Sequence, residues 1–270
     1  MIRPSTISPE AKAYIQPKLN ALAERENIQI LFAVESGSRA WGFPSADSDY
    51  DVRFVYARPR SDYLSVKEFR DVIETPLEDD ECLGVPLDLN GWDIRKALRL
   101  GLHSNPILHE WLVSPVRYYG DDSTVDLLRK FVVLTADKAV LRYHYDRLAR
   151  RAWEAEADQS QVKIKRYCYA LRPALTLNWL SASPDLPPMD VASLCANLSS
   201  PLISALSELF DLKRTCQEGD LINRKSVLDD FVHQALVEKA PRPPIASVDL
   251  VAIKIADDIF QRLLEFKVSE

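Results

Sequence analysis

Residues 35–53, ESGSRAWGFPSADSDYDVR, connect an apolar run at Ile28–Val34 to a second run that begins with two aspartates. The first run is short, rich in branched residues and bounded by polar ones, which predicts a buried strand. In the second run Val52, Phe54 and Tyr56 alternate with polar residues, which predicts a strand with one apolar and one ionic face. We therefore expect the segment to be a loop between two core strands.

Two aspartates one residue apart, Asp49 and Asp51, dominate the chemistry of this segment. Side chains alternate between the two faces of a strand, so both carboxylates are expected on the same face. They repel each other unless something positive lies between them, and a divalent cation with phosphate oxygens is the usual candidate. The backbone of the Gly37-Ser38 turn could donate N–H groups to those phosphates. The segment therefore indicates a nucleotide and metal site.

A third carboxylate, Asp88, lies in another alternating segment, Gly84–Gly91. Apolar residues there alternate with Asp88 and Asn90, which predicts a strand with Asp88 on its polar face. Two metal ions about 3.5–4 Å apart can neutralise a transferring phosphate and activate an attacking hydroxyl, and three carboxylates suffice to hold them. We expect Asp49, Asp51 and Asp88 to bind two Mg²⁺ ions, because Mg²⁺ takes oxygen ligands and accompanies substrate phosphates.

Further residues are candidates for contact with the nucleotide. Gly37 would let the backbone approach the phosphates, and Ser38 would add a hydroxyl donor. Arg39 and Arg53 flank the carboxylates and could either pair with them or reach a triphosphate. A later helix carries a stripe of Lys, Tyr and Arg, which could hold a triphosphate or stack a base, or could instead dock with its tyrosine in the core. The expected nucleotide-binding residues are Gly37, Ser38, Arg39, Lys96, Lys165, Tyr169 and Arg172.

The N-terminal part mixes helix and strand signals. Ser8 followed by Pro9 predicts a helix through about residue 25, kinked or interrupted at Pro17. Residues 69–75 are a weaker strand candidate, and the acidic run at 78–81 is expected to be a solvated loop.

Two short helices are expected before Ser114, and from Ser123 onward the pattern is almost wholly helical. Asp93 and Asn105 are expected to cap two short helices. The later helices are expected near 123–134, 136–157, 161–182, 201–216, 223–238 and 246–267. The chain is therefore expected to divide into a catalytic domain at 1–120 and a helical domain at 121–270.

Composition narrows the class of protein. The 270 residues, 47% of them apolar, supply a core for one large or two modest domains. The sequence shows neither a membrane span nor a signal peptide, so the expected location is the cytoplasm. Four widely spaced cysteines without a CxxC pair argue against a zinc site or a disulfide framework. The net charge of −6 argues against nonspecific binding to long nucleic acid, although a local basic patch could hold a short substrate.

The run from Gly37-Ser38 to Asp49-Tyr50-Asp51 resembles the signature of the DNA polymerase beta-like nucleotidyltransferase superfamily. The longer form, residues 36–42 with 48–51, is similar to one bacterial and phage branch, the predicted nucleotidyltransferases of the RNA-repair-pathway DNA polymerase beta family. Later segments that resemble this branch are 88–98, 105–112 and 165–173.

The resemblance implies an α+β protein with a minimal nucleotidyltransferase fold, a short mixed sheet with helices on one face, followed by an all-helical C-terminal domain. It also implies Mg²⁺ and a nucleoside triphosphate such as ATP. We expect an enzyme that moves a nucleoside monophosphate to a hydroxyl acceptor with release of pyrophosphate. An RNA end, a tRNA, a small molecule and a protein side chain all fit as acceptors. A noncatalytic nucleotide-sensing or partner-binding module and a protein-modifying, antitoxin-like transferase remain alternatives.

Overall fold

The computed structural model describes residues 2, 6–76, 78–155, 160–217, 219–244 and 248–265. Contacts group these residues into two compact units. The sheet unit comprises the described residues of Thr6–Gly37, Asp49–Ala136 and Ser247–Glu270, and the helical unit comprises those of Met1–Ser5, Ser38–Ser48 and Asp137–Ala246. In this part of the chain no helix combines the length and apolar character that a membrane span needs.

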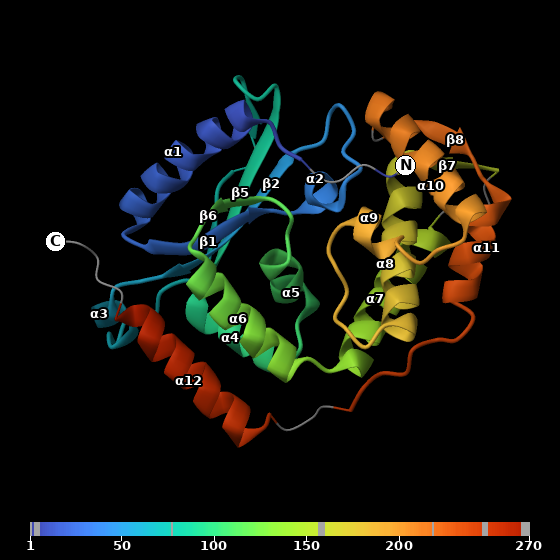
Figure 1. The fold of residues 1–270 in the computed structure, drawn as a ribbon. Helices are drawn as coiled ribbons and strands as arrows, with labels where there is room; N and C mark the ends of the chain where they lie inside the picture. Colours follow the sequence, from blue (N-terminus) through green and yellow to red (C-terminus); the bar gives the residue numbers. More distant parts are fainter. Residues whose placement is uncertain are drawn as a thin grey trace. The chain divides into compact units, whose positions relative to one another are not determined.

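The sheet unit is built on a mixed six-stranded sheet (Figure 1). The strand order is β3-β5-β2-β1-β6, with β4 paired to β5, and β2 and β5 are parallel while the other pairs are antiparallel. The strands are β1 (Gln29–Glu35), β2 (Tyr50–Ala57), β3 (Val72–Glu74), β4 (Glu78–Asp80), β5 (Val85–Asp93) and β6 (Arg117–Tyr119). The strands predicted on either side of residues 35–53 are confirmed as neighbours, β1 and β2.

Helices cover both faces of the sheet, where the sequence led us to expect one (Figure 1). Ile15, Leu19 and Leu22 of α1 (Pro9–Glu26) pack with one face of β1 and β2. The opposite face is covered by α4 (Ile94–Leu102), α5 (Pro106–Leu112), α6 (Asp122–Thr135) and α12 (Leu250–Leu264). Strand β1 is buried almost throughout, so its side chains are apolar on both faces of the sheet. Each face therefore needs its own layer of helices to exclude water.

Pro17 does not interrupt helix α1, which continues to Glu26 with Pro17 exposed and Ile15 and Leu19 buried. The predicted interruption is therefore wrong, and the alternative of a kink at Pro17 stays a prediction. The acidic run at 78–80 is strand β4 rather than a loop, because its backbone pairs with β5. The predicted caps are confirmed: the side chains of Asp93 and Asn105 accept from the backbone at the starts of α4 and α5.

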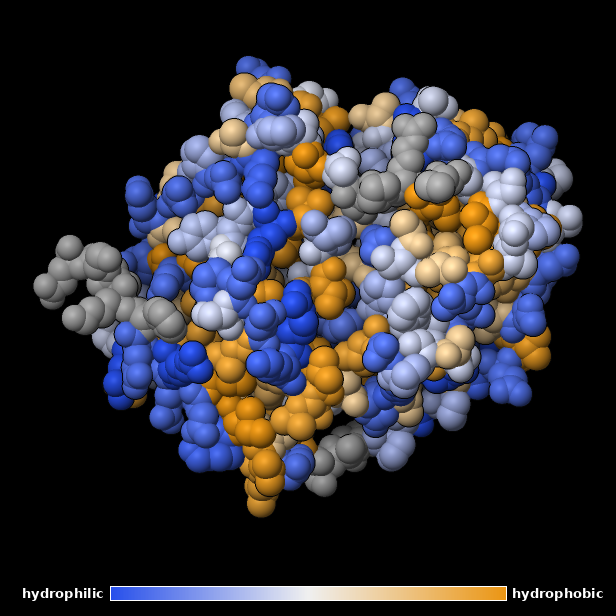
Figure 2. All heavy atoms as spheres, in the orientation of Figure 1, coloured by the Kyte–Doolittle hydropathy of each residue, from blue (hydrophilic) through white to orange (hydrophobic). Residues whose placement is uncertain are grey.

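Helix α12 belongs to the sheet unit although it lies near the end of the sequence. Its buried residues Ala256, Ile259 and Leu263 join the cluster formed by α4 and α6. Figure 2 shows apolar residues around the lower end of α12, where Leu250 and Val251 are exposed. The two units do not meet at residue 120, where the sequence predicted the domain boundary. Helices α6 and α12 lie beyond that residue and complete the apolar core on one face of the sheet.

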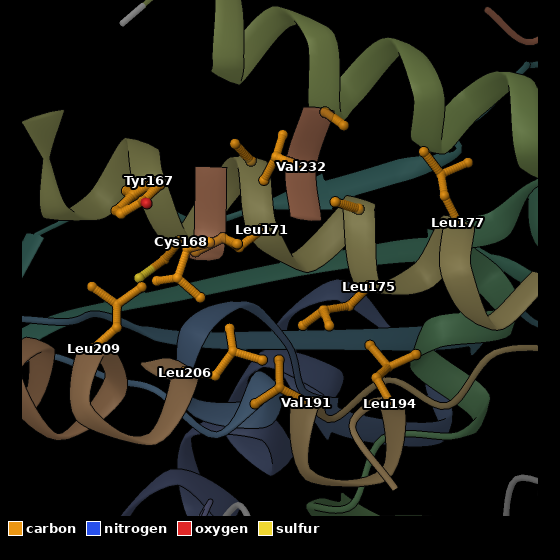
Figure 3. Packing of buried hydrophobic residues seen from close by; sticks show 14 of the residues in the cluster. Tyr167, Cys168, Leu171, Leu175, Leu177, Val191, Leu194, Leu206, Leu209 and Val232 are labelled. Carbon is orange, nitrogen blue, oxygen red and sulfur yellow. The ribbon is translucent and has the colours of Figure 1, made fainter. Parts of the chain in front are cut away.

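The helical unit has one main apolar core, centred on α8. Figure 3 shows Leu175 of this helix among Val191, Leu194 and Leu206. Its helices are α7 (Lys138–Glu154), α8 (Ile164–Ala182), α9 (Val191–Leu194), α10 (Ser200–Thr215) and α11 (Ser226–Ala235). The unit is not wholly helical, because β7 (Gln161–Lys163) and β8 (Leu221–Asn223) form a two-stranded antiparallel sheet. The last residues of the predicted helices at 136–157 and 246–267, and the first of the latter, lie outside the described residues.

Residues 38–48, between the two core strands, pack with the helical unit. The Phe43 ring is fully buried and stacks on Phe210 with ring centroids 4.9 Å apart. The guanidinium of Arg214 donates to the carbonyl of Gly42 at 2.9 Å. This loop, which includes all of α2 (Gly37–Trp41) except its first residue, is therefore held by aromatic stacking and hydrogen bonds of the helical unit.

Candidate active site

The site in the sheet unit is centred on two carboxylates from neighbouring parallel strands. Asp51 of β2 lies opposite Asp88 of β5 in the strand register. The guanidinium of Arg53 bridges them, with Nη2 2.9 Å from Asp51 Oδ1 and 2.7 Å from Asp88 Oδ2. The sequence left open whether Arg53 pairs with the carboxylates or reaches for a phosphate, and in this structure it pairs with the carboxylates.

All three side chains are partly open to solvent, with exposed fractions of 18% for Arg53, 28% for Asp51 and 27% for Asp88. A cationic group therefore fits between the two carboxylates, and the location is open enough for exchange. Charge-assisted hydrogen bonds of this kind are short and about twice as strong as neutral ones. The pair accordingly has the chemistry of a cation site, with an internal cation in place.

Gly37 is required by the position of the Asp51 carboxylate. Its backbone is left-handed, with φ of +59°, and an added Cβ would lie 2.0 Å from Asp51 Oδ2. No side chain can occupy that space without moving the carboxylate. The absence of a side chain at Gly37 therefore leaves the space that the Asp51 carboxylate occupies. The expected approach of the Gly37 backbone to phosphates stays a prediction.

The side chain of Glu35 accepts a hydrogen bond from the backbone of Asp51. This residue received no role in the sequence analysis. It is fully buried at the end of β1, and its Oε1 accepts from the Asp51 backbone N–H at 2.9 Å. Its Oε2 accepts from the Tyr118 hydroxyl at 2.6 Å. The available signal was a lone carboxylate at the end of an otherwise apolar run, because a charge there needs buried partners.

Asp49 lies immediately before β2, two residues from Asp51, and its side chain is partly buried. Within the described ranges, no three acidic, histidine or cysteine side chains form a group that could hold a metal ion. The structure thus brings Asp51 and Asp88 together around one positive group, and the three-carboxylate arrangement stays a prediction.

Lys96 is placed away from the paired carboxylates. It lies in the first turn of α4, beyond the C-terminal end of β5, and its Nζ is 3.1 Å from Asp71 Oδ2. Asp93, at the same end of β5, accepts from the Tyr63 hydroxyl at 2.9 Å. Burial raises the pKa of Asp93 above its ordinary value, and the hydrogen bonds from Arg95 and Tyr63 act in the opposite direction.

Ser38 and Arg39 belong to the helical unit, although they directly follow Gly37. The Ser38 hydroxyl is buried and donates to the Ser48 hydroxyl at 3.0 Å. Arg39 donates to the carbonyl of Ser48 at 2.6 Å. Both side chains thus close the loop at residues 38–48, and their expected contacts with a triphosphate stay predictions.

The predicted stripe on α8 forms a ladder of cations and rings around Trp41. Lys165 Nζ lies 5.8 Å from the centre of the Tyr169 ring, which meets Trp41 edge-on at 5.3 Å. The guanidinium of Arg172 lies over the other ring, 4.5 Å from the Trp41 centroid. Tyr169 is 38% exposed, whereas Arg172 is buried and donates to the Met189 carbonyl. The stripe does share one face, and Trp41 is the partner that the sequence analysis missed.

A buried lysine is a second omission of the sequence analysis in the helical unit. Lys213 is fully buried on α10, donates to the Ser45 hydroxyl at 3.3 Å and lies 5.7 Å from the Phe43 ring centre. No local pattern distinguishes it from the exposed lysines of an amphipathic helix. Its role in holding the loop at residues 38–48 depends on a contact between residues 168 positions apart.

A mixed sheet whose central parallel strands pair two aspartates beside a glycine turn, packed with helices, defines a protein of the α+β class. A family model described as RlaP, RNA repair pathway DNA polymerase beta family, matches residues 11–260. The chain belongs to the RNA repair pathway DNA polymerase beta family. This membership confirms the resemblance inferred from the sequence, and the family supports a general nucleotidyltransferase role.

Two of the proteins that resemble the chain come from Bacillus subtilis and Exiguobacterium sibiricum. A Bacillus subtilis (strain 168) relative, described as the uncharacterized protein YcgL, is 42% identical over 223 residues, or 82% of this chain and 84% of that protein. The crystal structure of a nucleotidyltransferase-like protein from Exiguobacterium sibiricum 255-15 matches with a TM-score of 0.31 and 14% identity, over 93% of this chain and 75% of that one.

Proposed function

We propose that the protein is a Mg²⁺-dependent nucleotidyltransferase that moves a nucleoside monophosphate from a nucleoside triphosphate, with ATP as the first candidate, to a hydroxyl acceptor. The observation that supports this proposal best is the pairing of Asp51 and Asp88 around a single positive group. Nucleotidyl transfer needs this chemistry, because the transferring phosphate must be neutralised where the acceptor attacks.

Asp51 and Asp88 would hold the metal, with Asp49 as the predicted third ligand. Bound Mg²⁺ supplies charge neutralisation for the triphosphate and orients its oxygens. With a metal there, Arg53 would leave the carboxylates, and its planar guanidinium could bond a phosphate through two nitrogens. Glu35 and Gly37 keep Asp51 in place throughout, the first through its backbone N–H and the second by leaving room for its carboxylate.

In the proposed step, the acceptor oxygen forms a bond to the α-phosphorus, and the bond from that phosphorus to the bridging oxygen of the β-phosphate breaks. Pyrophosphate leaves, and the acceptor proton passes to the carboxylate of Asp88. Asp88 suits this role because it lies on the neighbouring strand, opposite the ligand Asp51.

The nucleotide contacts predicted in the helical unit are part of the proposal. Tyr169 and Lys165 offer a partly exposed ring and a cation that suit a base and a phosphate. Ser38 and Arg39 would exchange their bonds to Ser48 for bonds to phosphate oxygens. Arg172 would act through Trp41, because its guanidinium is buried against that ring.

We propose an RNA end, including that of a tRNA, as the acceptor, supported by the family description, which names an RNA repair pathway. The test incubates the full chain with Mg²⁺, each radiolabelled triphosphate in turn, and RNAs with either a 3′ hydroxyl or a blocked 3′ end. Label transferred only to RNA with the free hydroxyl is the expected result. Label on protein alone would overturn the RNA acceptor and favour an antitoxin-like transferase.

A further inference from the structure

A cavity in the sheet unit lies at the far end of β2 and β5 from the paired aspartates. It has a volume of about 420 Å³, within the range of small-ligand sites. Arg58 follows β2 directly and lines this cavity, seven residues along the chain from Asp51. At roughly 3.3 Å per residue, the cavity is about 23 Å from Asp51 along β2 and about 17 Å from Asp88 along β5, where Asp93 lines it. The two places are therefore separate.

Cations dominate the wall of this cavity, although the chain as a whole is acidic. Four acidic side chains also line it, of which Asp71 pairs with Lys96 and Asp93 caps α4. Among the described residues, Lys96 is the one cation of the wall that forms an ion pair. The cationic residues of the wall are Arg58, Lys67, Arg70, Arg95, Lys96 and Arg99.

Several of these cations are held in place by aromatic rings rather than by carboxylates. Arg58 and Lys67 each lie 5.0 Å from the centre of the Phe69 ring, and Arg95 lies 4.8 Å from that of Tyr63. In addition, Arg58 Nε is buried and has no hydrogen-bond partner within the described ranges. The Arg58 guanidinium also donates from Nη2 to the carbonyl of Arg70 at 3.4 Å, so a ring and a backbone carbonyl hold it in place on the wall.

The ring and the charges match two parts of one ligand. Phe69 is 37% exposed, and a flat group that stacks on it would share the ring with Arg58 and Lys67, which each lie 5.0 Å from its centre. Guanidinium groups bind phosphate oxygens through paired hydrogen bonds, and Arg70 and Arg99 are exposed on this wall. Figure 2 shows hydrophilic residues around α3 (Arg60–Tyr63), which borders the cavity, at the left edge of the view.

We propose that this cavity binds a nucleoside diphosphate or triphosphate, with its phosphates on the arginines and its base on Phe69, as a second nucleotide site separate from the aspartate pair. The cavity volume suits a free nucleotide. The site does not require the proposed transfer reaction, because none of its lining residues is Asp51, Asp88 or Arg53.

The test is calorimetric titration of the full chain with ADP in EDTA, which removes the metal that the aspartate pair would need. The wild type should bind one ADP, and R70Q/R99Q should weaken binding by about tenfold or more, because both phosphate-facing charges are lost. The charge-matched control K12Q/K130Q, which changes two exposed lysines of the same unit, should bind within twofold of the wild type. D51N/D88N should also bind as the wild type does.

Three results would overturn the proposal. The first is no binding of ADP by the wild type. The second is binding by R70Q/R99Q as tight as by the wild type, and the third is loss of binding in D51N/D88N. A parallel titration with a ten-nucleotide RNA identifies the source of the phosphates: RNA binding that depends on Arg70 and Arg99, without ADP binding, would also refute a free-nucleotide site. The titration contains EDTA and no metal, so its result does not depend on the proposed transfer reaction. A failure of the proposed function can therefore be told apart from a failure of this nucleotide site.

Discussion

Arg53 Nη2 donates a hydrogen bond to Asp88 Oδ2 at 2.7 Å, and the same nitrogen lies 2.9 Å from Asp51 Oδ1. One guanidinium thus bridges two carboxylates on adjacent strands, and its single positive charge offsets only one of their two negative charges. This relationship sets the behaviour of the site without metal, because any other cation must compete with Arg53 for the same oxygens.

The first prediction concerns this competition. R53Q removes the internal cation and leaves Asp51 and Asp88 to repel each other, so the free energy of unfolding without metal should fall by about 1–2 kcal/mol, a value reduced for partial exposure. Mg²⁺ should restore more stability to R53Q than to the wild type, because its ligands are no longer occupied. Denaturant titrations with Mg²⁺ and with EDTA measure both effects.

A control for the Arg53 experiment is R25Q, which removes an exposed arginine of the same unit. Its stability should change little and should not depend on Mg²⁺. An equal Mg²⁺ response of R53Q and the wild type would contradict the competition.

The second prediction uses two glycines with similar backbones. Gly37 and Gly84 have φ of +59° and +68°, but an added Cβ meets Asp51 only at Gly37 and finds nothing within 4 Å at Gly84. Both G37A and G84A should cost about 1–2 kcal/mol for the left-handed conformation. G37A alone should also displace the Asp51 carboxylate and abolish nucleotidyl transfer, measured with labelled triphosphate. Equal activity of the two variants would refute the link between Gly37 and Asp51.

The third prediction makes Glu35 a positioning residue for Asp51. E35Q replaces one of two accepting oxygens with an amide donor, so it should lower the free energy of unfolding by about 1–3 kcal/mol. It should lower kcat more than it raises KM, because the metal ligand is misplaced while the nucleotide contacts remain. Y118F removes the other hydrogen bond of Glu35 and should leave kcat nearly unchanged. A decrease in kcat that is as large in Y118F as in E35Q would indicate general destabilisation instead.

The fourth prediction concerns pH. Asp121 caps α6, and hydrogen bonds from Ser123 and Thr124 lower its pKa to about 2. A pKa lowered in the folded state adds stability above the ordinary aspartate value, and this stability is lost as the pH falls towards the folded-state value. D121A should therefore lose about 1 kcal/mol at pH 7. The deficit should shrink between about pH 4 and pH 2, as denaturant titrations at several pH values would show. A constant deficit would contradict the lowered pKa.

Local signals predicted much of the fold. The caps at Asp93 and Asn105, the alternating strands and most helix positions depend on neighbours in sequence, and the structure confirms them. The pairing of β4 and of β7 with β8, and the return of α12 to the sheet, depend on contacts between distant segments. Periodicity contains no information about such partners, so these features were missed.

The candidate site likewise has features that the sequence predicted and features that depend on contacts between distant residues. Alternation correctly predicted Asp88 on a polar strand face, and the register then sets it against Asp51. The sequence could not show that Arg53 would bridge them, because the choice between phosphate and carboxylate depends on strand order. Nor could it show that Lys96 lies at the opposite end of β5 from the aspartate pair.

The most direct test of the proposed function is the rate of pyrophosphate release by D51N and D88N with Mg²⁺, a triphosphate and an RNA with a free 3′ hydroxyl. D126N, which changes an exposed aspartate of the same unit, is the matched control. We predict that each site variant loses at least about a hundredfold in rate, whereas D126N retains the wild-type rate. Wild-type rates in both D51N and D88N would contradict the account.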